Sequence, residues 1–187
     1  MKRIIISAFM LMLIHGAYAQ HVQFGIKGGV NFANLRNDAA DESADARTGF
    51  HVGGLAHIHI TRAFAVQPEI VYSTQGAEYG NDKLKLNYIN VPVLAQYMFA
   101  NGFRLQTGPQ LGILTTSEYE SGNTESDVDD LSNADFSWIF GASYVGRMGL
   151  GVDARYNLGL TDVSKSRTTD LQNRVWQIGL FYQFKPK

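Results

Sequence analysis

The chain contains no cysteine and only four prolines, and its charges nearly balance at a formal net charge of −1. The absence of cysteine excludes a disulfide scaffold, a thiolate zinc site, a cysteine nucleophile and a lipoprotein anchor. The near-neutral charge excludes the broad basic surface expected of a nucleic-acid-binding protein. A mean hydropathy of −0.13 excludes a bundle of membrane helices, since each helix needs about 20 mostly apolar residues. The 187 residues are nevertheless 45% hydrophobic, which predicts one folded domain of ordinary size.

The first 19 residues have the features of a secretory signal peptide. Lys2 and Arg3 form a basic segment, residues 4–14 are apolar, and Ala17-Tyr18-Ala19 is a small-residue cleavage motif. A buried N-terminal helix is the alternative interpretation, but the hydrophobic periodicity changes at Gln20. We therefore expect residues 1–19 to be a signal peptide cleaved near Ala19, and residues 20–187 to form the mature domain.

Apolar side chains recur at every second position after Gln20, which is the pattern of β-strands. The eight alternating runs cover residues 23–32, 50–60, 64–73, 89–99, 103–113, 136–144, 150–160 and 176–184. Short turns at 61–62, 100–102 and 146–149 alternate with longer polar segments at 35–47, 75–83, 115–135 and 161–174. Short turns at one end and long loops at the other are typical of outer-membrane barrels.

Two kinds of barrel are compatible with this alternation. A soluble periplasmic, lipocalin-like barrel would turn its apolar faces inward and bind a small apolar ligand. Three features favour the opposite orientation: the runs are long, the polar faces carry few charges, and aromatic residues gather near the strand ends. We therefore predict an all-β, eight-stranded antiparallel up-and-down transmembrane β-barrel with outward apolar faces, closed because unpaired backbone groups are not tolerated in lipid.

Three prolines interrupt the predicted strands at positions 68, 92 and 109. A proline lacks the N–H that a strand donates to its neighbour. The apolar parity also changes between Tyr88 and Ile89. A β-bulge near residues 90–92 would account for this change and for Pro92.

Five charged side chains fall on the predicted inward faces. They are Lys27, Glu69, Arg104, Asp153 and Arg155. The interior of an eight-stranded barrel is only wide enough for side chains, so buried charges there must pair or be solvated. We predict a network that joins Glu69 to Arg155 or Lys27, and Asp153 to Arg104 or Arg155; a polar conduit is the functional alternative.

Three histidines, His51, His57 and His59, share the same predicted inward face. His57 and His59 could bind a metal together with Glu69, but spacing fixes no third ligand, so we interpret the histidines as lumen hydrogen-bonding groups. His51 could also serve a lipid-modifying enzyme, yet its inward orientation points it away from lipid. The sequence has neither a nucleophile elbow nor a phosphate-binding loop, so we predict no enzyme, no metal and no cofactor.

The segment 115–135 is acidic and has no basic residue. Its carboxylates are Glu118, Glu120, Glu125, Asp127, Asp129, Asp130 and Asp135. Residues 127–130 could bind Ca²⁺ but lack the ligand spacing of an EF-hand. We interpret the segment as a solvated acidic outer loop that could contact a partner at the cell surface.

Several segments resemble the PorT-like outer-membrane β-barrel proteins of Gram-negative bacteria. The segments are 24–32 (FGIKGGVNF), 64–73 (FAVQPEIVYS), 86–97 (LNYINVPVLAQY) and 108–112 (GPQLG). The resemblance covers essentially the whole mature chain and includes the prolines. It implies an outer-membrane barrel. From the sequence as a whole we expect a monomer in the cell outer membrane, surrounded by lipid, with a structural or surface-recognition role through its long outer loops. Some relatives serve secretion machinery, so a secretion partner is a further expectation, although barrel motifs do not transfer such a role.

Overall fold

The computed structural model describes residues 22–37, 45–79, 82–121, 124–127, 134–161 and 171–184. The predicted signal peptide lies outside these residues. Nine strands form: β1 Val22–Asn37, β2 Asp45–His59, β3 Phe64–Tyr79, β4 Asp82–Met98, β5 Phe103–Ser121, β6 Thr124–Asp127, β7 Ala134–Val145, β8 Leu150–Gly159 and β9 Leu171–Gln183. None of the described segments is a helix long and apolar enough to cross a membrane.

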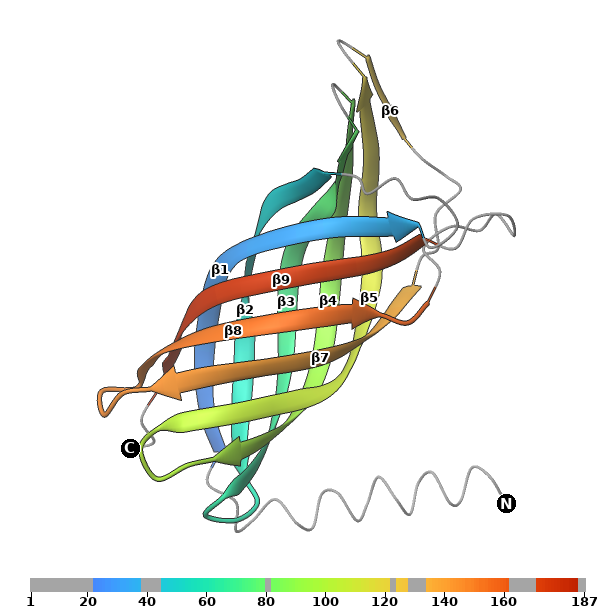
Figure 1. The fold of residues 1–187 in the computed structure, drawn as a ribbon. Helices are drawn as coiled ribbons and strands as arrows, with labels where there is room; N and C mark the ends of the chain where they lie inside the picture. Colours follow the sequence, from blue (N-terminus) through green and yellow to red (C-terminus); the bar gives the residue numbers. More distant parts are fainter. Residues whose placement is uncertain are drawn as a thin grey trace, which may run out of the picture.

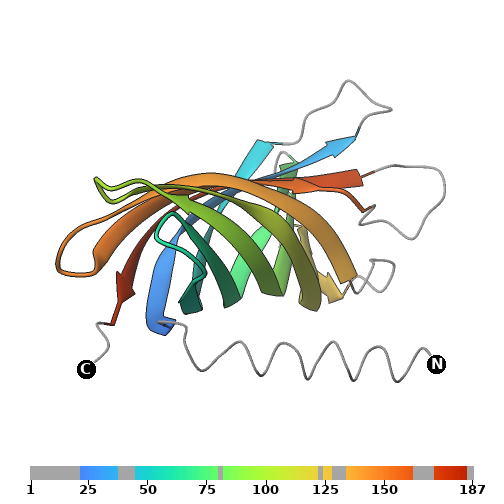
Figure 2. The ribbon, with the colours of Figure 1, turned by 90° about the horizontal axis from the view of Figure 1, so that it is seen from below.

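Eight of these strands close into an antiparallel barrel. Each strand of the wall pairs with the next one along the chain, with β5 pairing with β7. The ring closes because β9 pairs with β1 over residues 25–37. The short strand β6 pairs only with the end of β5 among the described strands and lies outside the ring. The strands curve around a common axis in both views (Figures 1 and 2). Closure satisfies the backbone hydrogen bonds that an open sheet edge would leave exposed to lipid.

The apolar side chains of the wall point outward and the polar ones point inward. Ile178 is 55% exposed, whereas Glu69 is 2% exposed. Among the described residues, 22 polar or charged side chains are buried against ten apolar ones, so the interior is not a hydrophobic core. The inverted orientation predicted from the strand pattern is therefore confirmed.

The three short connections lie at one end of the barrel. In the turn between β4 and β5, Gly102 adopts a φ of 91°, which a side chain rarely tolerates, and its N–H donates to the carbonyl of Phe99 at 3.1 Å. The opposite end is more regular than the sequence suggests, because β3, β4 and β5 continue through much of the segments expected to be loops. These strands rise above the rest of the wall in Figure 1.

The prolines are accommodated without the bulge predicted at residues 90–92. Each proline keeps its pairing with one neighbouring strand and coincides with a two-residue gap in the ladder to the other: Pro68 toward β2, Pro92 toward β3 and Pro109 toward β4. The register between β4 and β5 shifts higher up, between Asn87 and Tyr88.

The predicted bulge was wrong because the backbone of β4 keeps its alternation through Tyr88. Only the chemistry of the inward side chains changes there, from apolar to polar along the chain. Leu86 and Tyr88 simply point inward and are at most 1% exposed. The strand keeps its alternation, and Leu86 and Tyr88 place apolar groups beside the polar ones in the loop-side part of the lumen.

The outward apolar face predicts that a charge there destabilises the barrel. Ile178 lies in the middle of β9, so Ile178→Lys is expected to lower the free energy of unfolding in lipid vesicles by about 2–4 kcal/mol. Urea titration in phospholipid vesicles measures the change, with Ile178→Leu as the control. An unchanged unfolding midpoint for the lysine variant would show that this face does not contact lipid.

Candidate functional site

Four charged side chains meet in the middle of the lumen. Lys27 comes from β1, Glu69 from β3, and Asp153 and Arg155 from β8. All four are at most 4% exposed, and the two positive charges balance the two negative ones. Each points inward because it occupies the polar parity of its strand. We call these four side chains the lumen charge network.

The contacts within the lumen charge network are short and mutual. Arg155 donates two hydrogen bonds to the Glu69 carboxylate, from Nη1 to Oε2 at 2.8 Å and from Nη2 to Oε1 at 2.7 Å. Lys27 Nζ lies 2.8 Å from Asp153 Oδ2 and 3.5 Å from Glu69 Oε2. Arg155 Nε lies 2.8 Å from the same Asp153 oxygen. Each charge therefore contacts two opposite charges, which offsets the cost of removing it from water.

Arg104, the fifth predicted member, lies outside this network. Its side chain is 7% exposed and donates from Nη2 to Gln183 Oε1 on β9 at 3.1 Å. Asp153 Oδ2 is already contacted by Lys27 and Arg155. The structure thus brings together four of the five predicted charges and directs Arg104 to the end of the barrel where the short turns lie.

Two glutamines extend the network, and one of them adds a further strand. Gln67 donates from Nε2 to Glu69 Oε1 at 2.7 Å. Gln106 on β5 accepts from Arg155 Nη2 at 3.4 Å. The charges and their amide partners therefore cross-link β1, β3, β5 and β8 through the lumen.

A second polar cluster lies on the loop side of the charges and centres on Asn31. Its Nδ2 donates to Ser73 Oγ at 2.9 Å, and its Oδ1 accepts from Gln177 Nε2 at 3.1 Å. His51 Nδ1 is 2.8 Å from the same Asn31 oxygen. Sequence analysis missed Asn31 and Gln177 as network members; their inward parity was visible, but their shared height in the barrel was not.

Two inward glycines make room for this packing. The backbone register aligns His51, Gly29, Gly179 and Asp153 on four neighbouring strands. A Cβ at Gly29 would come within 2.2 Å of the Ile178 carbonyl oxygen, and one at Gly179 within 2.8 Å of Asp153 Oδ1. The side chains of His51 and Asp153 can therefore lean over the wall between them.

The other two histidines lie toward the short turns. His57 is fully buried, its Nδ1 is 3.3 Å from Gln67 Oε1, and its ring meets His59 edge to face at a centroid distance of 4.5 Å. Glu69, the third ligand of the metal alternative, is engaged by Arg155 and Lys27. The described part of the chain contains no group of three or more side chains suited to a metal ion.

The acidic residues are distributed differently from the single outer loop that was predicted. Glu118 and Glu120 belong to β5, Glu125 and Asp127 belong to β6, and Asp129 and Asp130 lie outside the described residues. Asp135 belongs to β7, is 7% exposed and accepts from Thr161 Oγ1 at 2.8 Å, so it is part of the barrel and not of a solvated loop.

The strand continuation has a physical reason in the register. Lys85 pairs with Glu118 and Lys83 with Glu120 across β4 and β5. Opposite charges at directly paired positions favour antiparallel pairing. We call the part of the sheet formed by residues 76–79, 82–87, 114–121 and 124–127 the projecting sheet.

Comparison with known proteins agrees with this architecture. The family model described as "Outer membrane protein beta-barrel domain" matches residues 18–165. The solved structure of Neisserial surface protein A is similar at a TM-score of 0.65 and 14% identity, covering 88% of this chain and 99% of that one. The attachment invasion locus protein Ail of Yersinia pestis is similar at a TM-score of 0.57 and 15% identity, covering 87% and 98%. At these identities the likeness shows the fold alone. No curated protein matches the sequence.

Removing one member of the lumen charge network should destabilise the barrel strongly. Glu69→Gln leaves Arg155 and Lys27 each with one carboxylate, and breaking such a buried pair costs about 3–5 kcal/mol. We expect that loss in the free energy of unfolding from phospholipid vesicles, measured by urea titration. Glu118→Gln, the same chemical change in the projecting sheet, is the matched control and should cost less than about 1 kcal/mol.

The double variant Glu69→Gln with Arg155→Gln separates pairing from packing. Because it removes a cation together with its partner, it should cost clearly less than the two single variants added together. Strict additivity of the two single effects would contradict the contacts described above.

Proposed function

Because the chain belongs to the outer membrane protein beta-barrel domain family, we propose that it is a small monomeric outer-membrane barrel with a filled lumen that recognises a partner at the cell surface through its projecting sheet. The proposal includes export by cleavage near Ala19. It also includes membership of the PorT-like branch, on the segments quoted for that resemblance. We propose no catalytic role.

The contrast between the lumen and the projecting sheet is the observation that supports this function. Side chains from four strands contact one another across the centre of the barrel, which supports a filled lumen over a polar conduit. By contrast, β5 continues from Ile113, its last residue paired with β7, to Ser121. At about 3.3 Å per residue this continuation is roughly 26 Å long, which is enough to carry it well beyond the rim. A hydrogen-bonded sheet that continues from a closed barrel offers a binding surface outside the membrane.

The charge of the projecting sheet indicates the chemistry of the partner. Its residues include six acidic and two basic side chains. One structure of Ail is a complex with the heparin analogue sucrose octasulfate, which is a polyanion. An acidic sheet would repel such a ligand, so for this chain we propose a cationic partner, such as a basic segment of a surface or secretion protein.

A charge-neutralised variant tests this function. With the full barrel in phospholipid nanodiscs, a lysine-rich peptide is expected to bind and heparin is not, measured by surface plasmon resonance. Changing Glu118, Glu120 and Glu125 to Gln and Asp127 to Asn should weaken peptide binding by roughly tenfold or more, and added salt should weaken it further.

One control variant and two possible contradicting results complete this test. The matched control changes Lys83 and Lys85, the two basic residues of the same sheet, to Gln, and it should bind the peptide at least as tightly as the unmodified protein does. Equal peptide binding by the unmodified and charge-neutralised proteins, or stronger binding of heparin than of the peptide, would contradict the proposed role of the projecting sheet.

A further inference from the structure

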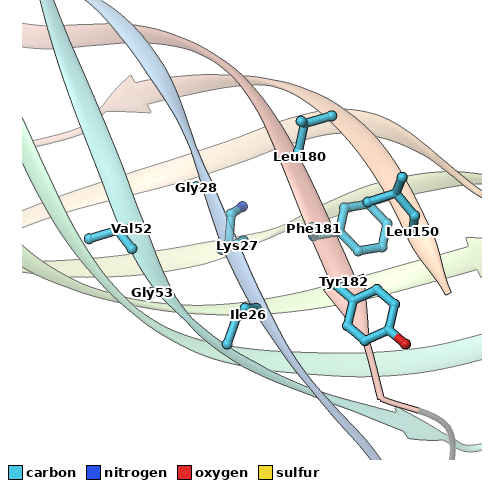
Figure 3. Close-up of a pocket in the computed structure, with 9 residues that line it drawn as sticks. All are labelled: Ile26, Lys27, Gly28, Val52, Gly53, Leu150, Leu180, Phe181 and Tyr182. Carbon is cyan, nitrogen blue, oxygen red and sulfur yellow. The ribbon is translucent and has the colours of Figure 1, made fainter.

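Two neighbouring grooves cross the outer wall over β1 and β2. The first has a volume of about 570 Å³ and is lined on its outer side by Ile26, Gly28, Val52, Leu150, Leu180 and Tyr182 (Figure 3). The second, of about 450 Å³, lies over Gly54 and is lined by Phe24, Ala56, Pro68, Ile70 and Val91. Apolar side chains dominate both linings, and both grooves are open to the lipid-facing side of the barrel.

Each groove exists because one outward position is a glycine. Gly28 pairs with Val52 and Leu180, and Gly54 pairs with Ile26 and Ile70. Larger side chains therefore stand on both sides of a position that has none. A side chain at Gly28 or Gly54 would fill the floor of its groove.

Packing within the barrel does not explain these two glycines. A Cβ at Gly28 would meet only the His51 carbonyl oxygen, at 3.4 Å, and one at Gly54 only the Gly25 carbonyl oxygen, at 3.9 Å. The inward Gly53, by contrast, leaves 2.2 Å to the Ile70 carbonyl oxygen. Neither Gly28 nor Gly54 has a positive φ. Glycine weakens a strand, so a barrel selected for stability alone would carry a side chain at both positions.

We propose that the two grooves hold the two acyl chains of one phospholipid from the periplasmic leaflet. The grooves are continuous with the outward apolar face, which the outer-membrane fold places in the bilayer, so hydrocarbon and not water fills them. Their volumes lie within the ~300–1,000 Å³ typical of small-molecule sites. This inference rests on the membrane-embedded fold and is independent of the surface-recognition role.

The position of the first groove along the barrel selects the leaflet. Leu150 directly follows the turn at residues 146–149, and short turns of outer-membrane barrels face the periplasm. Figure 3 shows the Tyr182 hydroxyl at the rim of the groove, on the side where β9 ends. Tyrosine is favoured at the level of lipid headgroups. Exposed Arg147 lies in the same turn and provides a positive charge for a headgroup phosphate.

Native mass spectrometry of the full barrel tests the proposal. The protein is reconstituted with palmitoyl-oleoyl phosphatidylethanolamine or with lipid A, and the lipid that remains bound after mild activation is counted. We expect the unmodified protein to retain the phospholipid. Gly28→Leu and Gly54→Leu should each lower the retained fraction by roughly tenfold, because each fills the floor of one groove.

Ala142→Leu is the matched control. Ala142 lies on the outward parity of β7, which lines neither groove, and it pairs with Ala154 of β8, so the added apolar bulk lies outside both linings. Heat-dependent gel mobility confirms that each variant is folded, and retention by Ala142→Leu should equal that of the unmodified protein.

Three results would overturn the proposal. The first is equal phospholipid retention by the glycine variants and the unmodified protein. The second is preferential retention of lipid A, the lipid of the opposite leaflet. The third is a dimer that is present in the unmodified protein and lost in Gly28→Leu, which would make the grooves a contact between two copies of the chain.

Discussion

The backbone has no hydrogen-bonding partner in the hydrocarbon of a bilayer, and the rest of the structure depends on this constraint. It requires the last strand to return to the first, as β9 does to β1. Closing eight strands leaves an interior only wide enough for side chains. Once the apolar residues face lipid, the polar residues have to fill that interior, and the charges among them have to be paired, as Glu69 and Arg155 are, or hydrogen-bonded, as Arg104 is. The lumen charge network is therefore a consequence of closure as much as a feature of its own residues.

The lumen, the projecting sheet and the outer wall differ in how far closure of the barrel determines their residues. The lumen joins strands that are far apart in the sequence, such as β1, β3 and β8, and so stiffens the cylinder. The projecting sheet rises from this stiff base with an excess of acidic residues. The wall over β1 and β2 has glycines where the barrel does not need them. The proposed recognition and lipid binding thus use surfaces that the barrel's own stability leaves available.

Strand number, inside-out orientation and the inward charges could be predicted because alternation depends only on local sequence. The contact partners were harder to predict, because parity shows which way a side chain points but not its height in the barrel. Height depends on strand tilt and register, which is why Arg104 meets Gln183 rather than Asp153. The predicted change of parity at Tyr88 was wrong because Leu86 and Tyr88 are apolar but point inward, and a lumen can also bury apolar side chains. Asp135 was assigned to a loop because it ends the polar segment 115–135 that precedes the alternating run, although its strand pairing places it in the wall.

The absence of cysteine makes a direct test of the inside-out arrangement straightforward, because any introduced cysteine is the only one in the chain. Single spin labels placed in turn along β9, with the barrel in phospholipid vesicles, report the accessibility of each position to dissolved oxygen, which concentrates in lipid. We expect high accessibility at Trp176, Ile178 and Leu180 and low accessibility at Gln177 and Gly179, with a period of two residues. High accessibility at Gln177 and Gly179 with low values at the apolar positions would contradict the account.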